Sequence, residues 1–154
     1  MALFSRLVAI IAATSMVYAL RSSAASAQSA TIDDLLSKSC PTAYDAGKEQ
    51  ERAHALAQDN RFALAKKAAE LYYDCYQQLS TAYARDWAHF EYLIYLSNSP
   101  PVADEERTVQ VLSIVGDGAN QLASATHFSD VRKAALWLRD NVKDEANHLI
   151  QVPP

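Results

Sequence analysis

The sequence has 154 residues, of which 50% are hydrophobic, whereas glycine occurs three times and proline five times. This composition fits one compact domain and excludes a collagen-like or disordered chain. The formal net charge of -4 and the lack of a Lys/Arg-rich run argue against nucleic acid or an anionic membrane surface as the main partner.

The first 27 residues have the features of a cleaved secretory signal. Arg6 precedes an apolar run, and Ala25-Ser26-Ala27 forms an A-x-A cleavage site. The run, residues 7–20, is shorter than the roughly 20 residues that span a bilayer, so we expect cleavage after Ala27 and no stable membrane insertion afterwards. The mature chain is then expected to be periplasmic or secreted. Its formal charge changes from -4 to -6, because Arg6 and Arg21 are lost and no acidic residue is lost.

Capping signals and apolar periodicity divide the remainder into helices. Residues 28–30 are expected to form a flexible lead-in, and Thr31 and Thr42, each followed by Asp three positions later, predict helices over residues 32–39 and 42–58. Apolar residues at spacings of three and four predict further helices. Two of them cover residues 62–79 and 82–97. A third begins after an Asp104 cap and ends at about residue 125, and a fourth begins after a Ser129 cap and ends at about residue 150.

No convincing strand pattern occurs, and the predicted fold class is all-α. We expect five main helices plus a short N-terminal one, arranged as antiparallel helical hairpins in a single domain over residues 31–150, with residues 151–154 as a tail. The segment Gly116-Asp117-Gly118 interrupts one helical pattern. It predicts either a kink or a close helix crossing at which a side chain would not fit.

Two cysteines, Cys40 and Cys75, lie in the predicted mature chain. In an oxidising compartment an isolated pair of this kind predicts a disulfide. A metal or redox pair is disfavoured because there is no C-x-x-C motif and no flanking histidine. The predicted bond would join the N-terminal segment to the helix over residues 62–79.

The predicted helix over residues 82–97 is apolar around most of its surface. Such a helix is either central in the core or partly exposed as a binding surface. If some of its large aromatic side chains are exposed together, they are the first candidates for a partner-binding patch. These candidates are Trp87, Tyr92 and Tyr95.

Two segments that begin at Ala53 and Ala119 resemble each other. Ala53 corresponds to Ala119, Leu56 to Leu122, Ala57 to Ala123, Phe62 to Phe128, and Lys67-Ala68-Ala69 to Lys133-Ala134-Ala135. The offset of 66 residues, from 53 to 119, is close to two periods of about 34 residues.

At these positions the chain resembles tetratricopeptide-repeat (TPR) proteins, over about half of the mature chain. Small residues on both helices of each unit and an aromatic residue at the turn follow the TPR pattern, whereas Asn60 and Thr126 replace the usual turn glycine. The resemblance implies a stack of antiparallel hairpins whose concave face binds a protein or peptide, without catalysis. A small Ala-rich helical bundle is the alternative architecture.

A second hypothesis comes from three acid-x-x-His pairs, each on a predicted helix. At this spacing both side chains share one helix face, as in the di-iron and di-manganese sites of helical bundles. The alternative is that they are surface pairs of small electrostatic value. The residues are Glu51 with His54, Asp86 with His89, and Glu145 with His148.

Catalysis has little support in the sequence. There is no G-x-S-x-G elbow, and the cysteines are expected to form a disulfide rather than supply a nucleophile. The sequence therefore predicts a non-enzyme without a cofactor, an exported interaction module whose partner is a protein or peptide. A metal-binding helical bundle is the second hypothesis.

Overall fold

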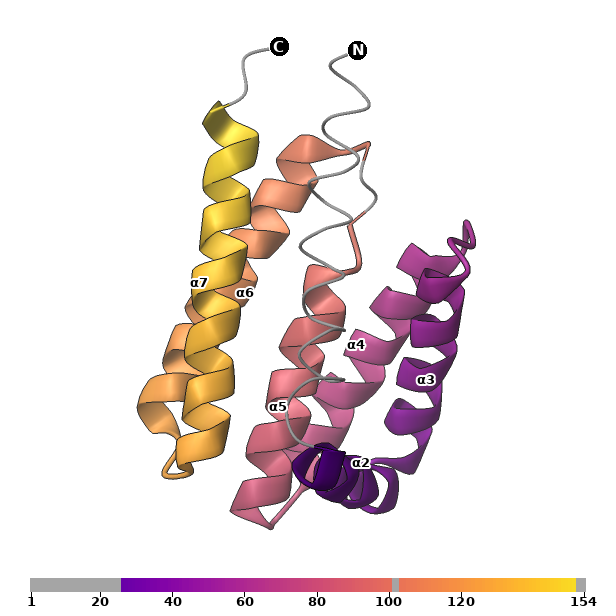
Figure 1. The fold of residues 1–154 in the computed structure, drawn as a ribbon, viewed down its shortest axis with the longest axis vertical. Coiled ribbons are helices and arrows are strands. Elements are labelled where there is room, and N and C mark those ends of the chain that lie inside the picture. The colour runs from indigo at the N-terminus through magenta and orange to yellow at the C-terminus, as the bar shows by residue number, and fades with distance from the viewer. Residues whose placement is uncertain (1–25, 101–102, 152–154) are drawn as a thin grey trace.

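The computed structural model describes residues 26–100 and 103–151 (Figure 1). Within these residues the chain is all-helical and contains no strand, so the predicted all-α class is confirmed. The helices are α2 (Ser26–Ser39), α3 (Pro41–Ala55), α4 (Arg61–Gln78), α5 (Ala82–Ser97), α6 (Glu105–Ala125) and α7 (Ser129–Gln151). Across the same ranges, none of these helices has the length and apolarity required to cross a membrane.

Two antiparallel hairpins lie on either side of a central helix. Helices α3 and α4 form one hairpin, α6 and α7 form the other, and α5 lies between them (Figure 1). Helix α2 packs against α3 and α5. A helix with neighbours on several sides must be apolar around most of its surface. Accordingly, α5 buries an unusually large set of side chains, including Trp87, Phe90, Leu93, Ile94 and Tyr95.

The Gly116-Asp117-Gly118 segment does not interrupt α6, which runs continuously from Glu105 to Ala125. A Cβ atom at Gly118 would lie 2.8 Å from Leu93 Cδ2 on α5, closer than packed carbon atoms approach. The close-crossing interpretation therefore explains Gly118. The helix tolerates the low propensity of glycine here because α5 packs against it.

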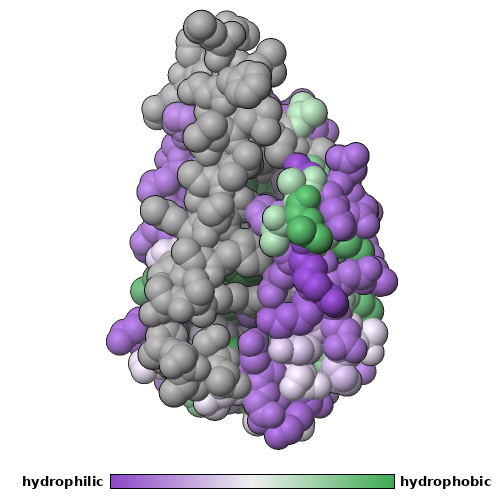
Figure 2. Space-filling model, turned by 45° about the vertical axis from the view of Figure 1, so that its right-hand side comes forward, coloured by the Kyte–Doolittle hydropathy of each residue, from purple (hydrophilic) through white to green (hydrophobic). Residues whose placement is uncertain are grey.

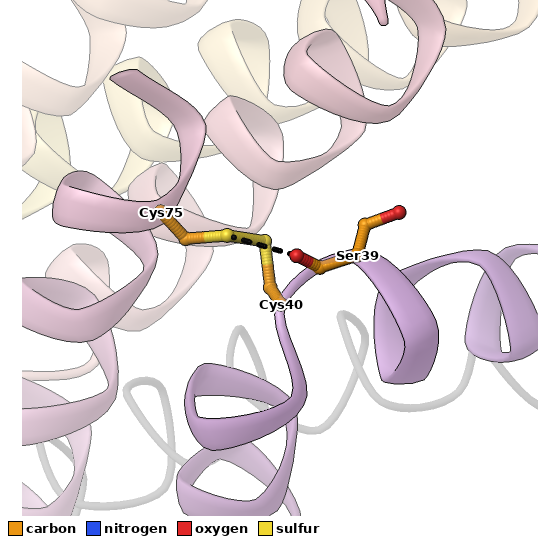
Figure 3. Close-up of a disulfide and its surroundings, with 3 residues drawn as sticks. All are labelled: Ser39, Cys40 and Cys75. Atoms are coloured by element: carbon orange, nitrogen blue, oxygen red, sulfur yellow. Dashed lines mark hydrogen bonds between the residues drawn. A yellow bond between two sulfur atoms is a disulfide. The ribbon is translucent and has the colours of Figure 1, made fainter. Parts of the chain in front are cut away.

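The predicted disulfide between Cys40 and Cys75 is present, with the two Cα atoms 5.9 Å apart. It joins the α2–α3 junction to α4 (Figure 3). Cys75 Sγ also lies 3.5 Å from the carbonyl oxygen of Ser39. A disulfide sulfur carries no hydrogen, so this is a packing contact rather than a hydrogen bond.

The helix starts differ from the predictions near the N-terminus. Residues 28–30 belong to α2 instead of a lead-in, and Thr31 lies inside that helix. Helix α3 begins at Pro41 with Cys40 at the N-cap position and no side-chain cap, so Thr42 does not cap it. Proline suits this first position, because its fixed φ is already helical and its missing N–H would have no partner there. The Asp104 cap is confirmed, since its Oδ1 accepts a hydrogen bond from the Arg107 N–H at 3.0 Å.

The predicted signal and tail fall largely outside the described residues. Residues 1–25 of the signal are not described, and Ser26 and Ala27 are the first two residues of α2. Of the predicted tail, residue 151 belongs to α7, and residues 152–154 are not described.

A left-handed residue forms the turn between α3 and α4. Ala57 has a φ of 51°. Its N–H donates to the His54 carbonyl at 3.0 Å, and the Gln58 N–H donates to the Ala53 carbonyl at 2.9 Å. These two bonds make a Schellman motif, which usually has glycine at the position of Ala57. The Arg61 guanidinium also donates to the carbonyls of Ala57 and Gln58, at 3.2 and 2.8 Å.

The two segments that resemble each other in sequence lie at the turns of the two hairpins. The small or branched residues matched between them are buried in both, namely Ala53, Ala65 and Ala69 in the first and Ala119, Val131 and Ala135 in the second. The matched leucines differ, because Leu122 is buried whereas Leu56 is 70% exposed at the end of α3. One helix, α5, lies between the hairpins, where a complete two-helix unit would supply two.

Candidate functional site

The predicted aromatic patch is not formed by the three residues proposed for it. Trp87 and Tyr95 are buried, with exposed fractions of 7% and 2%, and only Tyr92 reaches the surface. Tyr95 stacks on Tyr72 with ring centroids 5.6 Å apart, and its hydroxyl donates to Glu51 Oε1 at 3.0 Å. The condition of joint exposure is therefore not met, and α5 is the central core helix because it has packed neighbours on several sides.

Tyr92 instead belongs to an aromatic cluster that spans α4 and α5, here called the four-ring patch. It consists of Tyr73 and Tyr76 on α4 and of His89 and Tyr92 on α5. The Tyr76 and His89 rings are stacked, with centroids 4.5 Å apart and planes at 12°. Tyr73 contacts Tyr76 at 5.5 Å and Tyr92 at 5.3 Å, both edge to face.

Helical spacing places these rings together. Tyr73 and Tyr76 are three residues apart on α4, and His89 and Tyr92 are three residues apart on α5. Residues at this spacing share a helix face. Because α4 and α5 pack side by side, the two pairs meet at their interface. The sequence does contain this signal, two ring pairs at equal spacing on consecutive helices, but only the packing shows which pairs meet.

Partial burial favours the neutral forms of three rings of the four-ring patch. Desolvation raises the pKa of Tyr76 and of Tyr92, so their hydroxyls stay protonated. Desolvation also lowers the pKa of His89 below 6.5, and the nearby Asp86 carboxylate opposes this shift in part. The stacked imidazole is therefore neutral above its usual titration range.

Exposure distinguishes this patch from other apolar surface. The described part of the chain has four exposed large hydrophobic side chains, Leu56, Tyr73, Ile114 and Ile150. Of these, Tyr73, at 43% exposed, lies against other aromatic rings. The face drawn in Figure 2 is mainly hydrophilic over the described residues, with a small hydrophobic group. Scattered exposed aliphatic residues are ordinary, whereas clustered rings indicate a contact surface.

The acid-x-x-His pairs lie on three different helices, α3, α5 and α7. In residues 26–100 and 103–151, no group of three or more His, Cys, Asp or Glu side chains could hold a metal ion. Glu51 accepts from Tyr95 and also contacts Lys48 at 3.1 Å, and His89 stacks on Tyr76. The six side chains therefore do not converge on one site.

The remaining members of these pairs have separate environments. Burial and the nearby Arg61 charge lower the pKa of His54. Burial raises the pKa of Glu145, and the charge of the exposed His148 opposes this rise in part. Asp86 accepts a hydrogen bond from the Thr126 hydroxyl at 2.7 Å.

A polar network at the start of α5 was not predicted. The Tyr83 hydroxyl donates to Asp130 Oδ2 at 2.6 Å, and burial and this bond raise the pKa of Tyr83. The Thr126 hydroxyl donates to Asp86. The first bond joins α5 to the first turn of α7, and the second joins α5 to the turn between α6 and α7, so we assign the network a structural role.

No protein-family model matches this chain, and no curated protein or solved structure matches it either. The arrangement of the site therefore has to be interpreted from its own geometry. That geometry is a neutral, partly exposed aromatic surface held by two packed helices.

Proposed function

We propose that this chain is an exported, non-catalytic interaction module of the cell envelope, built from TPR-like helical hairpins, that binds a protein or peptide. The observation that supports this function best is the four-ring patch. Aromatic side chains dominate the binding energy of many protein interfaces, because they bury a large area and lose little conformational freedom.

The way the rings are held favours binding. All four belong to packed helices rather than loops, and each ring contacts at least two others in the patch. A surface that is already ordered loses less conformational entropy when a partner binds. The hydroxyls of the tyrosines add hydrogen-bonding groups at the edge of an apolar surface.

Two features support export. The N-terminal sequence has a secretory pattern with an A-x-A cleavage site, and the Cys40–Cys75 disulfide is compatible with an oxidising compartment. The buried small residues at matching positions of the two hairpins support the TPR-like architecture.

The proposed function can be tested by selecting peptides from a displayed random library on the disulfide-bonded protein. Each selected peptide is then measured against a Tyr73→Ala variant. We expect a class of peptides whose affinity falls at least roughly fivefold in this variant, as is usual when a contributing aromatic contact is removed.

Leu56→Ala provides the matched control, because Leu56 is also a large exposed residue. It precedes α4, whereas Tyr73 lies 12 residues after Arg61, about 18 Å along the helix. The same peptides should bind this control as well as the wild type. Recovery of peptides that all bind the Tyr73→Ala variant equally well would remove the patch as the binding surface.

A further inference from the structure

We propose that the four-ring patch recognises the cationic side chains of a partner, so that the bound segment is rich in arginine or lysine. This inference rests on the proposed function, since it specifies the chemistry of what the patch binds. It depends on three observations, namely the aromatic faces themselves, the absence of a cation over them among the described residues, and the acidic character of the surrounding sequence.

The first observation is the electronic character of the patch. The faces of neutral tyrosine rings carry partial negative charge and attract ammonium and guanidinium groups within about 6 Å. Tyr73 presents the most exposed ring, and Tyr92 meets it at 61° with centroids 5.3 Å apart. A guanidinium could therefore stack on one ring and contact the edge or hydroxyl of the other.

The second observation is how other rings of this protein are covered. Lys48 lies over the Tyr44 ring, with Nζ 5.2 Å from the centroid, and Arg61 lies over the Phe62 ring at 4.4 Å. Among residues 26–100 and 103–151, no lysine or arginine lies over a ring of the four-ring patch. Within the described residues, the protein thus pairs two partly exposed rings with its own cations and places no lysine or arginine over the four-ring patch.

The third observation is the charge of the surrounding sequence. Between Lys67 and Arg107, Arg85 is the single lysine or arginine. Acidic residues are frequent in the same stretch, and Asp74, which follows Tyr73 directly, is exposed. An excess of negative charge in the region of an aromatic surface attracts a cation and repels an anionic ligand. Charge complementarity therefore favours a basic partner over an acidic or neutral one.

The test uses three short capped peptides in which glycine alternates with arginine, glutamate or serine. Each is titrated into the disulfide-bonded protein at low salt, and the ring-proton resonances of Tyr73 and Tyr92 are followed by NMR. We expect saturable shifts with the arginine peptide and none with the glutamate and serine peptides. Added salt should weaken the arginine complex.

Two variants of Tyr73 separate ring recognition from apolar contact. Tyr73→Phe retains the aromatic face and should keep most of the affinity for the arginine peptide. Tyr73→Leu retains apolar bulk without the face, and the affinity should fall roughly two- to fivefold. Asp74→Asn should also weaken binding, whereas Leu56→Ala should leave it unchanged. Circular dichroism checks that each variant is folded.

The outcomes distinguish this inference from the proposed function. Equal binding of the arginine peptide by Tyr73→Leu and Tyr73→Phe would overturn cation recognition by the rings. Shifts of the same resonances with the serine or glutamate peptide would overturn the preference for cations and leave the binding function in place. Absence of any shift with the arginine peptide would overturn the inference, and the library selection would then decide whether the patch binds another kind of segment.

Discussion

Ala57 has the least ordinary backbone conformation of the described residues. It is the non-glycine residue with positive φ in residues 26–100 and 103–151, and it completes the Schellman motif that ends α3. The left-handed conformation costs an L-residue with a side chain roughly 1–2 kcal/mol, because Cβ is too close to the following carbonyl oxygen. Glycine has no Cβ and adopts this conformation without that cost. The native sequence therefore retains local strain at this turn.

We expect Ala57→Gly to increase the free energy of unfolding by about 1 kcal/mol, after the greater freedom of glycine in the unfolded chain is subtracted. Urea unfolding followed by circular dichroism measures the change. Ala63→Gly, an exposed position inside α4, is the matched control and should reduce stability by about 1 kcal/mol. Destabilisation by both variants would show that Ala57 is not strained.

His89 should make stability depend on pH. Its ring faces Tyr76 on α4, and Tyr92 and Asp86 on its own helix. Because burial lowers its pKa in the folded chain, the unfolded chain binds the proton first as the pH falls through about 6.5. The stabilising contribution is thus complete above this pH and decreases below it, until the folded-state pKa is passed.

We expect the wild type to lose more stability than His89→Phe when the pH falls from neutral to mildly acidic values. Phenylalanine retains a ring to stack on Tyr76 but cannot bind a proton. Urea unfolding at a series of pH values measures the difference, and the contribution of His54 cancels because both proteins contain it. Parallel pH profiles would contradict a neutral, partly buried imidazole at this position.

Among the elements, α5 shows most clearly what the sequence could predict. Its bounds, residues 82–97, agree with the prediction, because the apolar spacing and the Asn98-Ser99-Pro100-Pro101 breaker depend on local chemistry. The exposure of its aromatic residues was not predictable in the same way. Trp87 and Tyr95 are buried in a helix that packs against α2, α4, α6 and α7, so their environment is a property of the packing.

The helix ends also differ in how well the sequence predicts them. The Asp104 cap agrees with the sequence because the side chain and the amide that it accepts from are three residues apart. Helix α3 begins one residue before the predicted start, because Pro41 at the first position sets it and the Thr42 side chain does not cap it. The left-handed position of the turn after α3 holds Ala57 rather than the usual glycine, so the Schellman motif could not be identified from the sequence.

A hydroxyl of α5 contributes to the contact between α5 and the start of α7. Tyr83→Phe removes the 2.6 Å bond to Asp130, and we expect the free energy of unfolding to fall by about 1–2 kcal/mol, since the acceptor is a carboxylate. Tyr44→Phe is the matched control. Its ring contacts Lys48, and the described residues give its hydroxyl no hydrogen bond. Urea unfolding measures both variants. An equal change in the free energy of unfolding for the two would show that the Tyr83 hydrogen bond does not stabilise the fold.

At the scale of the whole molecule, the disulfide joins the N-terminal end of the fold to the first hairpin. Its two cysteines are 35 residues apart, and the loop-closure model assigns such a cross-link about 4 kcal/mol of stabilisation. We expect Cys40→Ala combined with Cys75→Ala to lower the free energy of unfolding by approximately this amount. Chemical denaturation of the disulfide-bonded wild type and of the double variant measures it. A loss below about 1 kcal/mol would show that the unfolded chain is already restricted without the bond.

The same cross-link determines how the molecule would respond to a mechanical load. A force applied to the chain ends passes from Cys40 to Cys75 through the sulfur atoms, so α3 and most of α4 are not under tension. An extended chain spans at most about 3.6 Å per residue, so the closed loop of 35 residues shortens the fully stretched protein by roughly 120 Å. The bond therefore gives this protein a segment that unfolds under load only after the disulfide is reduced.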